Sequence, residues 1–175
     1  LEPEKRIEDI LAALSLVAPH YPMVGLFVVG EGRERGRLER MVHSLGLVDH
    51  VIFMKGWRPA AEAWGLMRSA QAFIQASAYE GYGRTLIEAA LARVPIITTD
   101  VGIVGEVFKG YEDVLAVPVA DPTALSLSIV GIIEDNAVRQ ELPRHAEEAA
   151  HTHLAAVGDI PSRIAEDLAR ALQHP

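Results

Sequence analysis

The feature that most limits what this chain can fold into is the alternation of short apolar runs with stretches of helical periodicity. The apolar runs lie at 26–29, 51–54, 72–76, 95–98 and 114–117. A run such as Leu26-Phe27-Val28-Val29 has no polar alternation, so it predicts a strand that is buried on both faces. We therefore expect an α/β fold, a three-layer α/β/α arrangement with a parallel sheet that binds ligands at the carboxyl ends of its strands.

Helices are predicted where apolar residues recur at intervals of three and four. Such stretches lie at 7–17, at 38–45, around Trp64 and Met67, at 122–133 and at 159–172. The pair Asp121-Pro122 is a typical helix start, and Gly46 is a typical helix stop. No linker, repeat or low-complexity tract interrupts the pattern, so residues 1–175 are expected to form one domain.

Composition excludes several classes of function. A formal net charge of −8 argues against nucleic acid as a partner, so an anionic ligand would have to be held by local donors. The absence of cysteine rules out disulfides and thiolate zinc sites. His151 and His153 would point to different sides of a helix, and no metal site is predicted. No apolar run approaches the roughly 18 residues of a membrane span and the start is not a signal peptide, so the expected location is the cytoplasm.

The most informative segment for function runs from Glu80 to Glu88, two glutamates with seven residues between them. On one continuous helix their side chains would lie about 80° apart around the axis. Gly81 and Gly83 argue against such a helix, because glycine is favoured where the backbone bends tightly or approaches a ligand. We therefore place Glu80 on a loop after a buried strand and Glu88 about one turn inside the next helix. The N–H groups of residues 83–86 would then point out of that helix as a phosphate site.

Two carboxylates beside an anion site suit a ligand that is both a polyol and a phosphate, as nucleotide sugars are. Residues 77–90 closely resemble the Glu-x7-Glu signature of retaining glycosyltransferases of the GT-B type, family 4. The flanks agree: 94–102 followed by Glu106 resembles that family's next strand and Gly-rich turn, and 28–47 resembles its first nucleotide-domain unit. The fold that this resemblance implies is Rossmann-like, the carboxyl-terminal half of a GT-B glycosyltransferase.

The resemblance implies that the donor sugar lies against the loop between the two glutamates. Glu80 would accept hydrogen bonds from sugar hydroxyls, because an ionised carboxylate is an acceptor only. The backbone N–H groups of Gly81, Tyr82 and Gly83 would also face the sugar, while the Tyr82 ring would pack within the loop. By resemblance, Glu80 and Lys5 are the catalytic residues.

The rest of the nucleotide would bind to neighbouring residues of the same segment and of two others. The resemblance implies that Arg84 and Thr85 offer backbone N–H groups to the phosphates and that Lys5 neutralises the diphosphate. Glu88 would bind the vicinal ribose hydroxyls with its two oxygens. The base would be bordered by the loop Gly56-Trp57-Arg58.

By resemblance, the chain is the nucleotide-sugar-binding half of a two-domain enzyme of polysaccharide biosynthesis. It would bind a nucleotide-diphosphate sugar for retaining transfer to a hydroxyl acceptor, with no cofactor and no obligatory metal. The domain's first strand, which ends in Gly-Arg in the family, and the amino-terminal acceptor domain are expected outside residues 1–175. The chain alone is therefore expected to bind nucleotide without transferring sugar, and any peripheral membrane contact would be made through the missing half.

Two positions depart from the family pattern, and two alternative functions stay open. Arg93 stands where the family has a glycine, which makes a left-handed helix cap there doubtful, and Ile103 replaces the second glycine of the Gly-Gly turn.

One alternative function is a non-catalytic nucleotide-sugar-binding or regulatory module. The other is a dinucleotide-dependent oxidoreductase, which is disfavoured because Arg35 takes the place of the third glycine after Gly30 and Gly32.

Overall fold

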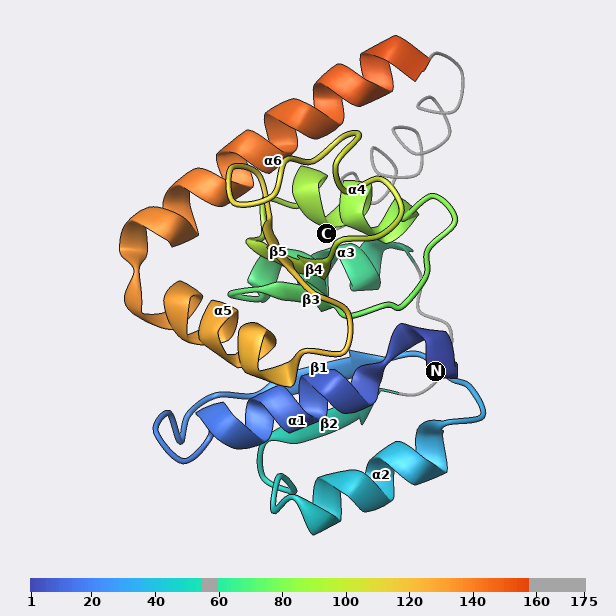
Figure 1. The fold of residues 1–175 in the computed structure, drawn as a ribbon, viewed down its shortest axis with the longest axis vertical. Helices are drawn as coiled ribbons and strands as arrows, with labels where there is room; N and C mark the ends of the chain where they lie inside the picture. Colours follow the sequence, from blue (N-terminus) through green and yellow to red (C-terminus); the bar gives the residue numbers. More distant parts are fainter. Residues whose placement is uncertain (55–59, 158–175) are drawn as a thin grey trace.

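A computed structural model of the chain describes residues 1–54 and 60–157. Its elements follow the predicted alternation of strands and helices (Figure 1). In chain order they are η1 (Pro3–Lys5), α1 (Ile7–Val17), β1 (Leu26–Val29), α2 (Arg35–Ser44), β2 (Val51–Met54), α3 (Ala60–Ser69), β3 (Phe73–Gln75), α4 (Arg84–Leu91), β4 (Ile96–Thr99), β5 (Leu115–Val117), α5 (Pro122–Glu134) and α6 (Asn136–Val157).

All strand pairs among the described residues are parallel, which confirms the predicted fold class. β1 pairs with β2, with Leu26 opposite Val51, and β4 lies between β3 and β5, with Ile97 opposite both Ile74 and Leu115. Figure 1 shows β1 and β2 with α1 and α2 in the lower half of the molecule and β3–β5 in the upper half. Helices lie on both sides of the sheet β3–β5, so the domain is a three-layer α/β/α structure.

The core on both sides of β4 is aliphatic, as expected for a central strand of a parallel sheet. All four residues of β4 are buried. Ile97 packs against α1 and α5 together with Val17 and Ile129. Ile96 points to the other side, where α3, α4 and α6 close the core with residues such as Leu86 and Ala146. Helices on both faces of β4 therefore hold the carboxyl ends of β3–β5 at one fixed edge.

The prediction that the run 26–29 is buried on both faces is wrong. Val28 is buried against α1 and α2, but Phe27 and Val29 are 58% and 44% exposed. On the neighbouring strand, Ile52 is 57% exposed. Within residues 1–54 and 60–157, the helices that pack on β1 and β2 lie on one face only, and the apolar side chains of the other face stay in contact with solvent.

The two sheets leave a gap between β1 and β3. In the described part of the chain β1 pairs only with β2, and β3 pairs only with β4. A cavity of about 1160 Å³ lies between them, lined by Phe27 and Val29 on one side and by Phe73 and Ile74 on the other. Each of these two strands therefore presents an edge whose backbone groups have no strand partner among the described residues.

Helix α6 was not predicted. Its 22 residues contain Pro143 in the interior and bury only Leu142, Pro143, Ala146 and Ala150, so no stripe of large apolar residues marks its inner face. Small alanines allow close packing on α4 without a strong periodic signal, and an internal proline ordinarily indicates a break. The helix predicted at 159–172 lies outside the described residues.

Close packing between α4 and α6 makes Ala146 sensitive to side-chain size. Ala146 is fully buried in the core cluster that joins the two helices, whereas Ala155 on the same helix is exposed. Ala146→Leu should lower the free energy of unfolding by about 1–3 kcal/mol because the added carbons overpack the interface. Ala155→Leu should change it by less than about 0.5 kcal/mol. Urea denaturation measures both, and equal losses would show that α6 does not pack as described.

Candidate functional site

The site forms where the loop after β3 meets the short helix η1 at the start of the chain. The backbone N–H of Ala78 donates to the carbonyl of Glu4 over 2.8 Å, which ties the loop to η1. Lys5, the next residue, directs its ammonium Nζ to Oε1 of Glu80 at 2.6 Å. Two residues that are 75 positions apart in the chain, and that the sequence analysis selected separately, are therefore in direct contact.

The backbone that follows Lys5 is held by Arg6. Arg6 ends η1 and precedes α1 with a φ of 47°, a left-handed conformation that costs a non-glycine residue free energy. Its guanidinium holds the buried carboxylate of Asp9 through two hydrogen bonds, of 2.6 and 3.0 Å. The hydrogen bond to Asp9 raises the pKa of Arg6 above its usual range. The hydrogen bonds between Arg6 and Asp9 thus hold the turn from which the Lys5 side chain extends.

Glu80 is held by two donors on the same oxygen. Besides Lys5, the hydroxyl of Ser77 donates to Oε1 of Glu80 over 2.6 Å. The carboxylate is only 12% exposed, whereas the Lys5 side chain is 43% exposed. Ser77 itself is fully buried, and its carbonyl accepts a 2.6 Å hydrogen bond from the hydroxyl of Thr99. Within the described ranges Oε2 makes no hydrogen bond, so it can accept one from a ligand.

A glycine lies directly against Glu80. Gly102 has a φ of +65°, and a Cβ added there would meet the Cβ of Glu80 at 3.0 Å. The neighbouring Ile103, which departs from the family pattern, is buried and packs against Gly83. Ile103 therefore packs in the core beside Gly83, and the contact that it makes with the loop is with that residue.

Helix α4 begins directly after the loop, as predicted. Its N-cap Gly83 has a φ of +74° and carries no side chain to cap the helix. The backbone N–H of Leu86 donates to the carbonyl of Gly83 over 2.9 Å and is not available to a ligand. The prediction that all N–H groups of residues 83–86 face a phosphate is therefore wrong for Leu86. The positive end of the helix dipole nevertheless points at the loop and favours an anion there.

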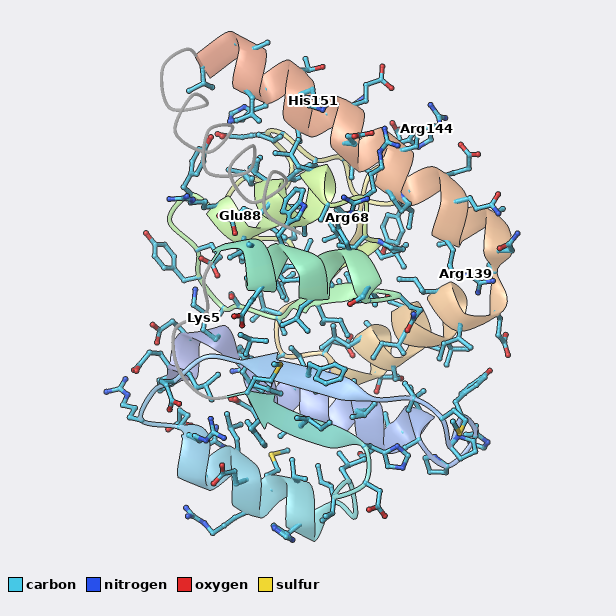
Figure 2. The ribbon with its side chains drawn as sticks, turned by 180° about the vertical axis from the view of Figure 1, so that it is seen from behind. Lys5, Arg68, Glu88, Arg139, Arg144 and His151 are labelled. Carbon is cyan, nitrogen blue, oxygen red and sulfur yellow. The ribbon has the colours of Figure 1, made fainter. Side chains whose placement is uncertain are left out.

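Glu88 lies one turn inside α4, which confirms its predicted position. Its Oε1 accepts a 3.0 Å hydrogen bond from the guanidinium of Arg84, and the carboxylate is 27% exposed. Figure 2 shows Lys5 and Glu88 on the same side of the molecule and Arg139 on the opposite side. Glu80 and Glu88 line the 1160 Å³ cavity together with Lys5 and Thr85, so one continuous space reaches both carboxylates.

Gln75, at the end of β3, is a polar residue in the cavity wall that the sequence analysis did not select. Its Oε1 accepts a 2.6 Å hydrogen bond from the hydroxyl of Thr85. Its Nε2 is buried and has no partner among residues 1–54 and 60–157. Ser77 and Thr99 were also not selected. The available signal was the interruption of apolar strands by Gln75, Thr98 and Thr99, polar residues that are buried and so need partners.

The doubt about a left-handed helix cap at Arg93 is wrong. Arg93 has a φ of 57° and its N–H donates to Ala90 over 3.0 Å, which ends α4 with the conformation that glycine usually supplies. Its guanidinium reaches Glu147 on α6 at 2.7 Å. The ion pair with α6 is an interaction that glycine cannot make, and it offsets part of the cost of the left-handed backbone.

No group of three or more histidine, aspartate and glutamate side chains converges on a metal-sized site in the described parts of the chain. His151 approaches Glu147 at 3.9 Å, whereas His153 contacts Tyr82, so the two histidines do point apart.

None of the described helices combines the length and the apolar character needed to cross a membrane. Gly56, Trp57 and Arg58, assigned to the base, lie outside the described residues.

Comparison with known proteins identifies the family. Residues 1–153 match the model of the family named glycosyl transferases group 1. The chain therefore belongs to the glycosyl transferases group 1 family, which confirms the resemblance of the segment 77–90 at the level of a group 1 glycosyltransferase and leaves no support for the oxidoreductase alternative. A curated relative, glycogen synthase of Mycobacterium tuberculosis, is 29% identical over 158 residues, which are 85% of this chain and 36% of the relative. The chain thus spans about a third of that relative's length.

Two solved structures are similar in fold. The carboxyl-terminal domain of the group 1 glycosyl transferase LpcC from Francisella tularensis has a TM-score of 0.79 at 22% identity, covering 87% of this chain and 80% of that one. Anabaena Alr3699/HepE, solved in complex with UDP and glucose, has a TM-score of 0.81 at 25% identity, covering 97% of this chain and 46% of that one. The fold is thus that of the carboxyl-terminal domain of GT-B glycosyltransferases.

The contact between Gly102 and Glu80 can be tested against a matched glycine. Gly102 and Gly105 both have positive φ, at +65° and +89°, but only Gly102 has an atom within 4 Å of an added Cβ. Gly105→Ala should cost only the backbone strain, about 1–2 kcal/mol. Gly102→Ala should cost on the order of 1 kcal/mol more, because Glu80 must also move. Urea denaturation measures the difference, and equal costs would mean that Gly102 does not support Glu80.

Proposed function

We propose that this chain is the donor-binding domain of a glycosyltransferase and binds a nucleotide-diphosphate sugar at the end of the 1160 Å³ cavity where Lys5, Glu80, Thr85 and Glu88 lie. The observation that carries the proposal is the joint placement of Lys5, Glu80, Thr85 and Glu88 on the wall of that one cavity. A cation and a helix N-terminus suit the diphosphate, and two separate carboxylates suit two sets of hydroxyls. The UDP- and glucose-bound Anabaena structure supports the same class of ligand.

The contacts of the two glutamates favour a division of roles. Glu80 contacts Lys5 and immediately precedes the Gly81–Gly83 loop. The donor sugar would contact the backbone N–H groups of that loop. Glu88 lies one turn further along α4, paired with Arg84, where the ribose would follow the phosphates. The ammonium of Lys5 has three donors, so it can hold Glu80 and a phosphate oxygen at the same time.

The proposed reaction is retaining transfer of the sugar to a hydroxyl acceptor in polysaccharide biosynthesis, in the cytoplasm. The protein's part is to stabilise the charge that develops on the leaving diphosphate through Lys5 and the N-terminus of α4, with no obligatory metal. A non-catalytic nucleotide-sugar-binding or regulatory module is the alternative. It would bind the same ligand, so only turnover by the whole protein separates the two.

The gap between β1 and β3 supports a second part of the proposal. An extended apolar segment that precedes Leu1 would lie between these strands and join the two sheets into one. It would fill the part of the cavity between Phe27 and Ile74 and leave the end at Lys5 and Glu80 for the ligand. The carbonyl of Leu1 accepts the N–H of Glu34 over 3.1 Å, which places residue 1 beside the carboxyl end of β1. A strand that ended there would run parallel to both neighbours. The acceptor domain would precede that strand, which fits the coverage of only 36% of the glycogen synthase relative.

The division of roles predicts different losses for the two glutamates. Glu88→Ala should weaken binding of both UDP and UDP-glucose, because the ribose is common to both ligands. Glu80→Ala should weaken only UDP-glucose. Each loss should be on the order of 1.5–3 kcal/mol, the value of a hydrogen bond to a charged group. Calorimetric titration measures the four affinities, and adding EDTA should leave the wild-type values unchanged.

The control for Glu88→Ala is Glu39→Ala on α2. Arg35 and Glu39 form the same i,i+4 contact as Arg84 and Glu88, at 2.8 Å, outside the 1160 Å³ cavity. Glu39→Ala should therefore leave both affinities unchanged. Melting temperatures without ligand show whether any variant has lost its fold. If both site variants lost the two ligands equally at unchanged stability, the division of roles would be refuted.

A further prediction concerns turnover. The 175 residues should bind nucleotide sugar but transfer no sugar to an added acceptor, since the proposed acceptor domain lies outside them. A longer protein that includes the proposed strand and acceptor domain should transfer it, and its β1 and β3 amides should exchange hydrogen more slowly than those of residues 1–175 alone. Release of nucleotide diphosphate and hydrogen exchange measure the two effects. Turnover by the isolated chain would overturn the two-domain proposal.

A further inference from the structure

The segment from Gly81 to Gly83 has few local restraints of its own. A Cβ added at Gly81 would meet no atom within 4 Å, and Gly83 is in the left-handed region. Glycine loses more conformational freedom on folding than any other residue, so a loop with glycine on both sides of Tyr82 needs an external contact to hold one conformation. Lys5 and Ser77 fix Glu80, but they do not reach the backbone beyond it.

The external contact comes from α6. The hydroxyl of Tyr82 lies 2.6 Å from Nε2 of His153, and the two rings are 5.9 Å apart between centroids. Six residues earlier on α6, Glu147 pairs with Arg93 at 2.7 Å. Tyr82 precedes α4 and Arg93 follows it, so α6 runs antiparallel to α4 and contacts the chain beyond both of its ends.

The body of α6 cannot shift easily relative to α4. Ala146 immediately precedes Glu147, and Ala150 lies between Glu147 and His153. Both alanines are fully buried against α4 in the core. A helix packed through alanines brings the two backbones close together, and packed interiors resist small displacements. His153 is therefore held on a rigid element, and the hydrogen bond to it transfers that rigidity to Tyr82.

We propose that His153 is a positioning residue for the donor sugar, which acts by holding the Tyr82 hydroxyl and so fixing the backbone of the Gly81–Gly83 loop. This inference rests on the proposed function and adds a residue to it that lies on the last described helix. His153 does not line the 1160 Å³ cavity, so it would act on the ligand only through Tyr82. Because the loop would contact only the sugar, a change at His153 should alter the affinity for the nucleotide sugar and not the affinity for the nucleotide diphosphate alone.

The first test measures the loop without ligand. His153→Phe keeps a ring of similar size but removes the hydrogen bond, whereas His153→Gln keeps a polar side chain that can bond the hydroxyl. His151→Phe, two residues before His153 on α6 and directed toward Glu147 instead of Tyr82, is the control. NMR order parameters of Gly81 and Gly83 should fall in His153→Phe, stay near wild type in His151→Phe and recover at least in part in His153→Gln. Unchanged order in His153→Phe would overturn the proposal.

The second test measures the affinities for UDP and UDP-glucose. His153→Phe should weaken UDP-glucose by about three- to tenfold, the range expected for one lost hydrogen bond, and leave UDP unchanged. Tyr82→Phe should do the same, and the double variant should lose no more than either single one, because both remove the same contact. Equal losses of UDP and UDP-glucose with a lowered melting temperature would show a structural role instead.

The two tests separate this inference from the proposed function. If the wild-type chain bound neither probe, the proposed function would fail for these ligands, and the order parameters would still decide whether His153 fixes the loop. If the wild-type chain bound both and His153→Phe bound both equally well, the proposed function would stand and the role of His153 would be refuted.

Discussion

The ion pair between Lys5 and Glu80 is the interaction on which the arrangement of the site depends. It joins the helical turn at the start of the chain to the loop that leaves β3, across 75 positions of sequence. Glu80 is only 12% exposed, so the contact is screened less by water than an ordinary surface pair. Ser77 and Gly102 act on the same residue, one by hydrogen bonding and one by leaving room for it. The arrangement of the end of the cavity at Lys5 and Glu80 follows from these contacts around one carboxylate.

The fold could be predicted from sequence where large apolar residues made a period visible. The strand at 51–54 and the helix at 7–17 were found with the correct bounds because large apolar residues form a continuous run in the first and recur at helical spacing in the second. Helix α6 was missed because Ala146 and Ala150 bury little surface and Pro143 indicated a break. The exposure of Phe27 was missed for a different reason: a local pattern records that a strand is apolar, but not whether its neighbours are present.

The candidate site was predicted better than its supporting contacts. Glycines and carboxylates at fixed spacing placed Glu80 on a loop and Glu88 on a helix, as the structure has them. Which side chains restrain them depends on tertiary contacts across 22 to 71 positions, as for Thr99 with Ser77 and His153 with Tyr82, and no local period encodes those. Arg93 shows the same limit, because its left-handed backbone is compensated by a partner on α6.

The open edges of β1 and β3 have a consequence for handling the protein. These two edges face the same cavity, and Phe27 and Val29 are exposed beside them. A strand from another molecule can pair with such an edge. An excess of negative charge opposes close approach of two copies, but added salt screens it. Solutions of the isolated chain should therefore be kept dilute and low in salt, since concentrating them in high salt favours edge-to-edge assembly over the monomer.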